Sequence, residues 1–338
     1  MVSTKITCNP PFLDHYKPIF EDSSKINQLR DNQKQQVVEE CDLPLIDLSG
    51  LRSGDKAERI ACMAAIAEAS SEWGFFQVLN HGISLDLLGE MRKEQRKVFE
   101  MPFERKVSSK LLNDSYRWGT PSATSLDQFS WSEAYHVPLA MISKQNCCNE
   151  FNHLREVMEQ VAVAMSELSC TLAGVLAENL GYPGHRFTES CNKSTCFLRL
   201  NRYPPCPFSP ETFGLQPHTD SDFLTILCQD QVGGLQLMKD SQWVAVKPNP
   251  DALIVNIGDL FQAWSNDIYK SVEHKVMANA KLERYSIAYF LCPSYDSTIG
   301  SCRESSLYKS FTFGEFRRQV QEDVKQTGRK VGLSRFLR

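Results

Sequence analysis

The hydrophobic pattern of the chain changes near residue 190, and this change limits the folds that it can adopt. Before it, apolar residues recur at three- and four-residue spacings and predict helices at 56–73, 85–100 and 152–180. After it, short apolar runs divided by turn residues predict strands at 195–203, 223–229, 234–238, 243–246, 252–257, 270–277 and 285–291. Many short strands in succession are typical of a jelly roll. The predicted fold is mixed α and β, with a double-stranded β-helix (jelly-roll) core flanked by helices.

Four regions follow from this pattern. Residues 1–42 are polar and poorly periodic, which predicts a mobile or weakly packed N-terminal arm. Residues 43–190 form a helical N-terminal region with short strands at 43–48 and 75–79. Residues 191–295 form the jelly-roll core, and residues 296–338 form a C-terminal helix, at 313–325, with a tail. We expect the helical region to pack on the core rather than to fold alone.

Charge and composition argue against several classes of protein. The 338 residues carry a net charge of −4, so the chain lacks the basic surplus of nucleic-acid-binding proteins. No apolar run approaches the roughly 20 residues that span a bilayer, and the N-terminus lacks a signal-peptide core. We expect a cytoplasmic protein, with the nucleus as a second location, that is neither secreted nor bound to a membrane. The 12 cysteines include no C-x-x-C pair, which argues against a structural zinc site; the adjacent Cys147 and Cys148 are assigned no role.

Residues 115–138 are predicted to form a long loop rather than a helix, because Gly and Pro interrupt them. The loop is rich in rings, namely Tyr116, Trp118, Phe129, Trp131, Tyr135 and His136. Loops of this length inside a compact domain are usually functional. Two interpretations stay open: the loop covers a hydrophobic core, or it closes over a substrate.

The segment 216–222 contains His218 and Asp220 and predicts a strand, so both side chains are expected on one face. Alone the pair is a weak signal, because core histidines commonly have only structural contacts. His274 lies in another strand, 271–277, where alternation predicts that its ring points inward. Together the three would form a face of two imidazoles and one carboxylate. Asp222 is an alternative carboxylate, which the spacing of two residues disfavours.

This ligand set with open positions is typical of non-haem Fe(II) oxygenases, and zinc with a bound water is the alternative. Arg284 starts an alternating strand and shares its face with Ser286, Ala288 and Phe290. A buried guanidinium needs an anion, and its planar donors suit a carboxylate. A zinc hydrolase would give this arginine no role. Asn201 and Tyr203 share a strand face elsewhere, where ordinary polar packing is the competing interpretation.

In order and spacing, these residues resemble the 2-oxoglutarate- and Fe(II)-dependent dioxygenases of plants. The similar segments are Asn-Arg-Tyr-Pro-Pro-Cys-Pro at 201–207, His-Thr-Asp at 218–220, His274, Arg-Tyr-Ser at 284–286, and residues 43–48 and 73–82. The resemblance implies that His218, Asp220 and His274 bind Fe(II). It also implies that Arg284, Ser286, Tyr203 and Asn201 hold 2-oxoglutarate. Molecular oxygen would be the second substrate, 2-oxoglutarate would be decarboxylated to succinate, and ascorbate would support the activity.

Segments 116–125, 129–136, 229–237 and 261–266 resemble the gibberellin 2-oxidases that act on twenty-carbon gibberellins. The implied reaction is a 2β-hydroxylation that inactivates this plant hormone or its precursors. Asp127 stands where a basic or neutral residue is expected in relatives. Such a substrate is a rigid apolar carboxylic acid, so we expect an apolar pocket with one cation. The candidates are Ala288 and Phe290 for the walls, Arg199 and Arg117 for the carboxylate, and Tyr116 and Trp118 for loop contacts.

Other functions remain open. An enzyme with the same mechanism could act on another target, as a gibberellin 20- or 3-oxidase or a flavonoid enzyme. A homologue could also keep the fold and bind gibberellin without catalysis. Such a protein is expected to lack a metal ligand or the arginine, and the sequence retains all of them.

Overall fold

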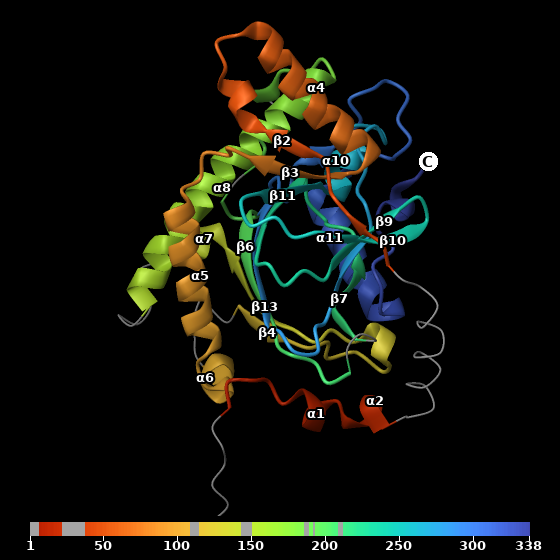
Figure 1. Ribbon diagram of the computed structural model, residues 1–338. Coiled ribbons are helices and arrows are strands. Elements are labelled where there is room, and N and C mark those ends of the chain that lie inside the picture. The colour runs from red at the N-terminus through yellow and green to blue at the C-terminus, as the bar shows by residue number, and fades with distance from the viewer. Residues whose placement is uncertain are drawn as a thin grey trace, which may run out of the picture.

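Two β-sheets face each other in the computed structural model, and helices cover the outer face of the larger sheet (Figure 1). The structure describes residues 7–21, 38–108, 115–142, 151–185, 189–191, 193–208 and 212–338. The larger sheet has the strand order β2-β3-β11-β8-β13-β6-β5-β4, and the smaller has the order β1-β10-β9-β12-β7. Neighbours within each sheet come from distant parts of the chain. The predicted jelly-roll core with flanking helices is confirmed.

The larger sheet consists of β2 Leu45–Asp47, β3 Phe75–Leu79, β4 Tyr116–Trp118, β5 Glu133–Pro138, β6 Phe197–Tyr203, β8 Leu224–Gln229, β11 Leu253–Ile257 and β13 Arg284–Leu291. The smaller sheet consists of β1 Glu40–Cys41, β7 Phe213–His218, β9 Leu235–Lys239, β10 Gln242–Val246 and β12 His274–Met277. A separate pair is formed by β14 Thr298–Ile299 and β15 Phe311–Thr312. The helices are α1 Phe12–His15, α2 Lys17–Glu21, α4 Lys56–Glu72, α5 Leu85–Phe99, α6 Phe103–Ser108, α7 Leu139–Ile142, α8 Asn152–Asn179, α10 Asp259–Trp264 and α11 Phe313–Thr327. Short 3-10 turns are η1 Leu48–Arg52, η2 Leu126–Gln128 and η4 Gly332–Phe336.

Side-chain caps fix where the long helices begin. The carboxylate of Asp55 accepts a hydrogen bond from the N–H of Ala57 at 2.7 Å at the start of α4, and Ser84 caps α5 in the same way. Thr312 and Glu315 form a capping box at the start of α11. The helices predicted at 56–73, 85–100, 152–180 and 313–325 agree with α4, α5, α8 and α11 to within two residues at either end. The short helix α10 was not predicted.

The long helix α8 lies against the larger sheet on the left of Figure 1, and it contacts β8, β13 and helices α4, α5 and α7. Within the described residues, it is the one helix whose length and composition would suit a membrane span. More than half of its most apolar stretch is buried inside the protein. Such burial is the behaviour of a core helix, and it explains why α8 is apolar.

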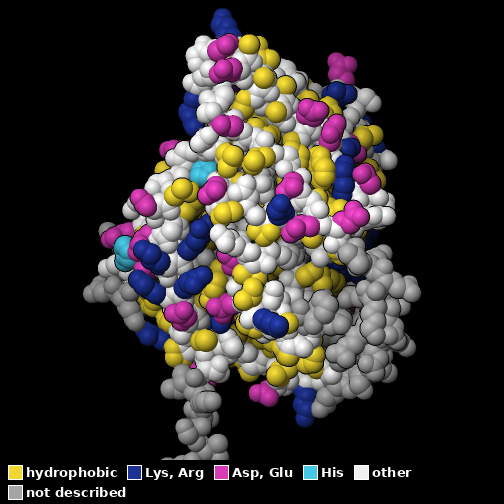
Figure 2. Space-filling view, viewed as in Figure 1, with side chains coloured by type: hydrophobic (Ala, Val, Ile, Leu, Met, Phe, Trp, Pro, Cys, Tyr) yellow, Lys and Arg dark blue, Asp and Glu magenta, His cyan; other side chains and the backbone are white. Residues whose placement is uncertain are grey.

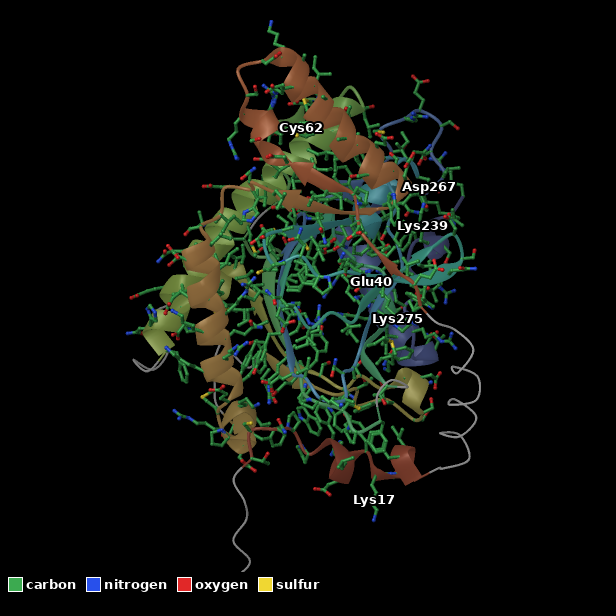
Figure 3. All side chains as sticks on the ribbon, viewed as in Figure 1. Lys17, Glu40, Cys62, Lys239, Asp267 and Lys275 are labelled. Carbon is green, nitrogen blue, oxygen red and sulfur yellow. The ribbon has the colours of Figure 1, made fainter. Side chains whose placement is uncertain are left out.

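Two hydrophobic clusters hold these layers together. The larger one joins the outer face of the larger sheet to α4, α5 and α8. The second lies between the sheets and combines Phe75, Tyr203 and Ile254 with Leu237 and Val276 of the smaller sheet. Figure 3 shows side chains filling the space between the sheets, with Glu40, Lys239 and Lys275 labelling three strands of the smaller sheet. On the face shown in Figure 2, charged side chains of both signs are interspersed among scattered apolar ones.

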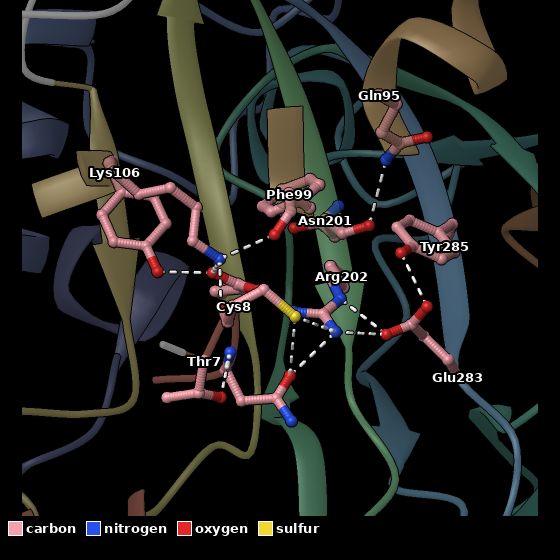
Figure 4. A network of polar contacts seen from close by, with 12 residues as sticks. Thr7, Cys8, Gln95, Phe99, Lys106, Asn201, Arg202, Glu283 and Tyr285 are labelled. Atoms are coloured by element: carbon pink, nitrogen blue, oxygen red, sulfur yellow. Dashed lines mark hydrogen bonds and ion pairs between the residues drawn. The ribbon is translucent and has the colours of Figure 1, made fainter. Parts of the chain in front are cut away.

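The N-terminal segment 7–21 differs from the weakly packed arm that the sequence predicts. Lys106 donates a hydrogen bond from Nζ to the carbonyl oxygen of Cys8 at 2.7 Å, and Arg202 donates one from Nη2 to Oδ1 of Asn9 at 2.8 Å (Figure 4). Both cations also pair with the buried carboxylate of Glu133. The segment therefore closes a buried polar network. Residues 22–37 of the predicted arm, and Cys147 and Cys148, lie outside the described residues.

Aromatic packing anchors the same segment. Phe12 is 3% exposed, and its ring stacks on that of Trp131 with centroids 4.5 Å apart. Tyr16 packs on Phe129, with centroids 4.5 Å apart. The aromatic residues of the segment are spaced by four, a helical stripe that the polar composition of residues 1–42 concealed.

The predicted loop 115–138 is only partly a loop. Its two ends are strands β4 and β5, which pair with each other and extend the larger sheet. Its central rings, Phe129 and Trp131, pack against Phe12 and Tyr16. Of the two interpretations, covering a hydrophobic core fits these rings.

Candidate metal centre and active site

His218 and His274 lie opposite each other in the antiparallel pair formed by β7 and β12. Their ring centroids are 4.3 Å apart. In each ring Nδ1 faces a backbone carbonyl oxygen, that of Gln216 at 2.8 Å and that of Val272 at 3.0 Å. A carbonyl oxygen only accepts, so each Nδ1 carries the proton. The lone pair of each Nε2 is therefore available to a metal.

Asp220 completes the group. Its Oδ1 lies 3.6 Å from Nε2 of His218, and its Oδ2 lies 3.8 Å from Nε2 of His274. One ligand atom from each residue falls within 4.8 Å of the others. The predicted strand at 216–222 was wrong beyond His218, because β7 ends there and Asp220 lies in the following turn. The carboxylate reaches the histidines through that turn, where the N–H of Asp259 donates to the carbonyl oxygen of Asp220 at 2.9 Å.

Two neighbours orient the carboxylate of Asp220. Thr225 donates from Oγ1 to Oδ2 at 2.6 Å, and Asn256 donates from Nδ2 to the same oxygen at 2.8 Å. Burial by itself raises the pKa of Asp220, but the neighbouring imidazoles of His274 and His218 and these two hydrogen bonds outweigh it and hold the pKa below its ordinary value. The carboxylate is therefore ionised at neutral pH.

His218 is held neutral. Burial, followed by the neighbouring imidazole of His274, lowers the pKa of His218 to about 3. Neutral imidazoles and an ionised carboxylate are the protonation states that metal ligands need. Two imidazole nitrogens and one carboxylate oxygen on one face, with the other positions open, fit Fe(II) in an oxygenase.

Asp222, the alternative carboxylate, does not join this group. It is 1% exposed, and its Oδ2 lies 3.0 Å from the hydroxyl oxygen of Thr225, while its Oδ1 has no partner within the described structure. Burial, followed by the charge of Asp220, raises the pKa of Asp222 well above its ordinary value. Gly258 packs so closely that an added Cβ would stand 2.1 Å from Oδ1 of Asp222. A carboxyl group enclosed this tightly, outside the group formed by His218, Asp220 and His274, is a poor metal ligand.

A second group of possible metal ligands, Glu90, Glu94 and His153, lies between α5 and α8. Its two carboxylates already pair with Lys93 and Lys97. The imidazole is 58% exposed. With both carboxylates already paired and its imidazole exposed, this group is an ordinary ion-pair network near the surface.

Arg284 tests whether 2-oxoglutarate fits beside the metal group. It is 2% exposed, donates from Nη2 to Oε1 of Gln229 at 2.9 Å, and lies 3.5 Å from the hydroxyl of Ser286. Its guanidinium is 4.9 Å from the ring centre of Tyr203, and its Nε has no partner. No carboxylate pairs with it among the described residues. A buried cation with an unused donor fits the distal carboxylate of 2-oxoglutarate.

One cavity of about 220 Å³ joins these parts. The smaller sheet and the turn after it supply His218, Asp220 and His274. The larger sheet supplies seven further residues of the predicted site, namely Arg284, Ser286, Tyr203, Asn201, Arg199, Ala288 and Phe290. The metal group thus lines one side of the space between the sheets. Strands β6 and β13, which carry Arg199 and Arg284, line the other side.

Three candidates for substrate contacts are not among the residues that line this cavity. Tyr116 donates its hydroxyl hydrogen bond to the buried carboxylate of Glu133. Arg117 is exposed and bonds from Nη1 to the carbonyl oxygen of Tyr116 at 2.6 Å. Trp118 packs edge-on against Phe12 and other rings of the N-terminal segment. Each of these side chains is already engaged outside the cavity.

Several residues of the cavity wall were not identified from the sequence, and three of them bear on the substrate. His136 stacks on Phe197, with ring centroids 4.0 Å apart, and Phe197 stacks on Phe290 at 4.3 Å. Arg317 reaches the cavity from α11. The alternation of β5 and β6 could have identified the first two. Nothing in the sequence placed α11 at the cavity.

Comparisons with known proteins agree with this geometry. Residues 194–293 match the model of the 2OG-Fe(II) oxygenase superfamily, and residues 43–156 match that of the non-haem dioxygenase in morphine synthesis N-terminal region. Gibberellin 2-beta-dioxygenase 6 of Oryza sativa subsp. japonica is 61% identical over 310 residues, which is 89% of this chain and 87% of that protein. Gibberellin 2-beta-dioxygenase 8 of Arabidopsis thaliana is 60% identical, over 89% and 88% of the two chains. Among solved structures, JOX2 in complex with 2OG, Fe and JA matches with a TM-score of 0.70 and 36% identity, over 83% of this chain and 85% of that one.

Proposed function

The chain belongs to the 2OG-Fe(II) oxygenase superfamily, and we propose that it is a gibberellin 2-beta-dioxygenase that inactivates gibberellins, twenty-carbon precursors in particular. It is an oxidoreductase that uses Fe(II), 2-oxoglutarate and oxygen. The assignment to gibberellins rests on relatives named for that activity at 60–61% identity over nearly nine tenths of the chain.

The observation that carries the dioxygenase class is the pairing of two features in one cavity. Three potential ligands converge with their donor atoms within 4.8 Å, and a buried arginine without a carboxylate partner lies on the facing sheet. A zinc hydrolase accounts for the first feature but leaves the buried charge unexplained. A site for Fe(II) and a dicarboxylate accounts for both.

We assign the roles as follows. His218, Asp220 and His274 would hold Fe(II), while Arg284 and Ser286, with Tyr203 and Asn201 beside them, would hold the far carboxylate of 2-oxoglutarate. When bound, iron and 2-oxoglutarate supply the oxidant that hydroxylates a C–H bond. The chain fixes the geometry, and Phe75, Leu215 and Leu235 give the cavity apolar walls that limit access of water.

The substrate carboxylate has its own candidate site at the other end of the cavity. Arg199 lies opposite both His136 and Ala288 in the larger sheet, roughly 13 Å along β6 from the level of Arg284. Nε of Arg199 is buried and has no hydrogen-bond partner in the part of the chain that the structure describes. Burial, followed by the charges of Arg199 and Arg317, lowers the pKa of His136 to about 4, so this ring is neutral. Arg199 and Arg317 are thus the cations that an acidic substrate would meet there.

Product analysis tests the proposal. The purified protein, given Fe(II), 2-oxoglutarate, ascorbate and oxygen, is offered twenty- and nineteen-carbon gibberellins in parallel. We expect one added oxygen at the 2β position, with succinate formed in equal amount and the twenty-carbon substrates preferred. Oxidation at carbon 20 or carbon 3 would identify a gibberellin 20- or 3-oxidase instead. Absence of succinate with every gibberellin, together with turnover of a flavonoid, would reject the gibberellin assignment.

A further inference from the structure

Lys330 lies behind the metal group, although it stands only eight residues before the end of the chain. Helix α11 ends at Gly328, whose left-handed conformation (φ 74°) turns the chain sharply. Two residues later, Nζ of Lys330 lies 2.6 Å from Oδ2 of Asp259 and 2.8 Å from the carbonyl oxygen of Thr219. The side chains of Lys330 and Asp259 are only 10% and 4% exposed.

Asp259 is bonded to the chain beside each of the three potential ligands. Its Oδ2 accepts from the hydroxyl of Thr219 at 3.2 Å, and Thr219 stands between His218 and Asp220. Its backbone N–H donates to the carbonyl oxygen of Asp220 at 2.9 Å. Its Oδ1 accepts from the hydroxyl of Ser271 at 2.7 Å, in the segment that leads into His274. One buried carboxylate therefore ties together the two separate pieces of chain that carry the ligands.

A buried carboxylate in this position needs a cation. Within the described residues, the ion pair with Lys330 is the one that Asp259 makes. Lys330 is itself held by the C-terminal segment, because its Nζ lies 5.6 Å from the ring centre of Phe316, which packs on Phe336. Removing the ammonium would leave the carboxylate buried and unpaired, so the turn at 219–222 and the start of α10 would have to shift to hydrate it.

We propose that Lys330 is a positioning residue of the metal centre: it neutralises Asp259, and through it fixes the backbone beside all three ligands. Neither residue lines the cavity, so the effect is exerted on the metal and not on the substrate. The inference rests on the proposed function only in taking His218, Asp220 and His274 as metal ligands. It does not depend on which substrate is oxidised.

Metal binding by the apo protein tests this role. Co(II) is the probe, since its visible absorption reports both affinity and geometry. Removing a residue that supports metal ligands from behind typically weakens metal binding 10- to 100-fold. We expect Lys330→Met to bind Co(II) more weakly by this factor and to show an altered Co(II) spectrum. The matched control is Lys325→Met, which removes the same charge from an exposed position of α11 and is expected to bind Co(II) as the wild type does. Unchanged affinity and spectrum in Lys330→Met would overturn the proposal.

The double variant Asp259→Asn/Lys330→Met separates positioning from simple packing of the C-terminal segment. It leaves no buried carboxylate without its cation, so we expect it to bind Co(II) more tightly than Lys330→Met but about three- to tenfold more weakly than the wild type, because the ion pair that fixes Asp259 is still missing. Co(II) binding as weak as in Lys330→Met, or weaker, would overturn the proposal. If Lys330→Met does not fold, the double variant decides alone, and wild-type affinity and spectrum there would reject the role. Gibberellin turnover by the wild type is scored separately, so failure of the substrate assignment is distinguishable from failure of this inference.

Discussion

His218 and His274 are register partners at adjoining ends of β7 and β12, with ring centroids 4.3 Å apart. This pairing places two imidazoles from segments more than fifty residues apart at one edge of the smaller sheet. Asp220 then needs only a turn to reach them. Strand pairing therefore fixes the two histidines of the metal group. The turn that carries Asp220 is the part of the group that a substitution should displace most easily.

Replacement of the two neighbouring aspartates should have opposite outcomes. Asp220→Asn removes the ionised ligand, and we expect loss of Co(II) and Fe(II) binding and of 2-oxoglutarate decarboxylation. Asp222→Asn replaces a buried carboxyl group that lies outside the metal group and whose pKa is raised. We expect metal affinity within about threefold of wild type. Metal titration of both apo variants checks this, and loss of binding in Asp222→Asn alone would reverse the assignment.

Arg284→Met should affect 2-oxoglutarate and leave metal binding intact. Losing a charge-assisted hydrogen bond of about 1.5–3 kcal/mol predicts a KM for 2-oxoglutarate raised about 10- to 100-fold. Without 2-oxoglutarate the variant should be at least as stable as wild type, because it removes a buried charge that has no carboxylate partner among the described residues. Thermal unfolding with and without 2-oxoglutarate checks both statements. Arg284→Lys keeps the charge but not the planar arrangement of donors, so its KM for 2-oxoglutarate should lie between those of the wild type and Arg284→Met.

Much of the site could be predicted, because the alternation of residues within a single strand is enough to show which side chains share a face. Arg284, Ser286, Ala288 and Phe290 follow one another along β13, so a local pattern located all four. Asp220 lies with the two histidines as expected, but it reaches them through a turn and not through the predicted strand. Arg317 and Lys330 could not be found, because their positions depend on how α11 packs against distant strands. Tyr116 and Trp118 suited a pocket by type, but a buried glutamate and the N-terminal rings engage them instead.

The two arginines at the far end of the cavity should govern the binding of an acidic substrate. We expect Arg199→Met and Arg317→Met each to raise the KM for the gibberellin about 10- to 100-fold, with the KM for 2-oxoglutarate unchanged. Arg117→Met is the matched control, since its side chain is exposed and bonds to a backbone carbonyl. Steady-state kinetics of the three variants decides the assignment. An effect confined to Arg117→Met would move the carboxylate site to the loop.

His136 should make the stability of the apo protein depend on pH. Burial, with the nearby arginines, lowers its pKa from 6.5 to about 4 in the folded state. The unfolded chain takes up a proton near pH 6.5, whereas the folded chain does not until about pH 4. The stabilisation is therefore fully present above pH 6.5 and is lost as the pH falls toward 4. Between pH 7 and pH 5 this one ring should lower the free energy of unfolding by about 2 kcal/mol.

Urea unfolding at both pH values checks the predicted pH dependence of stability. The variant His136→Gln should remove the part due to His136, whereas His15→Gln, at an exposed position of α1, should retain it. If the wild type and His136→Gln lost equal stability on acidification, the prediction would fail. The folded protein would then protonate His136 with its cavity wall intact.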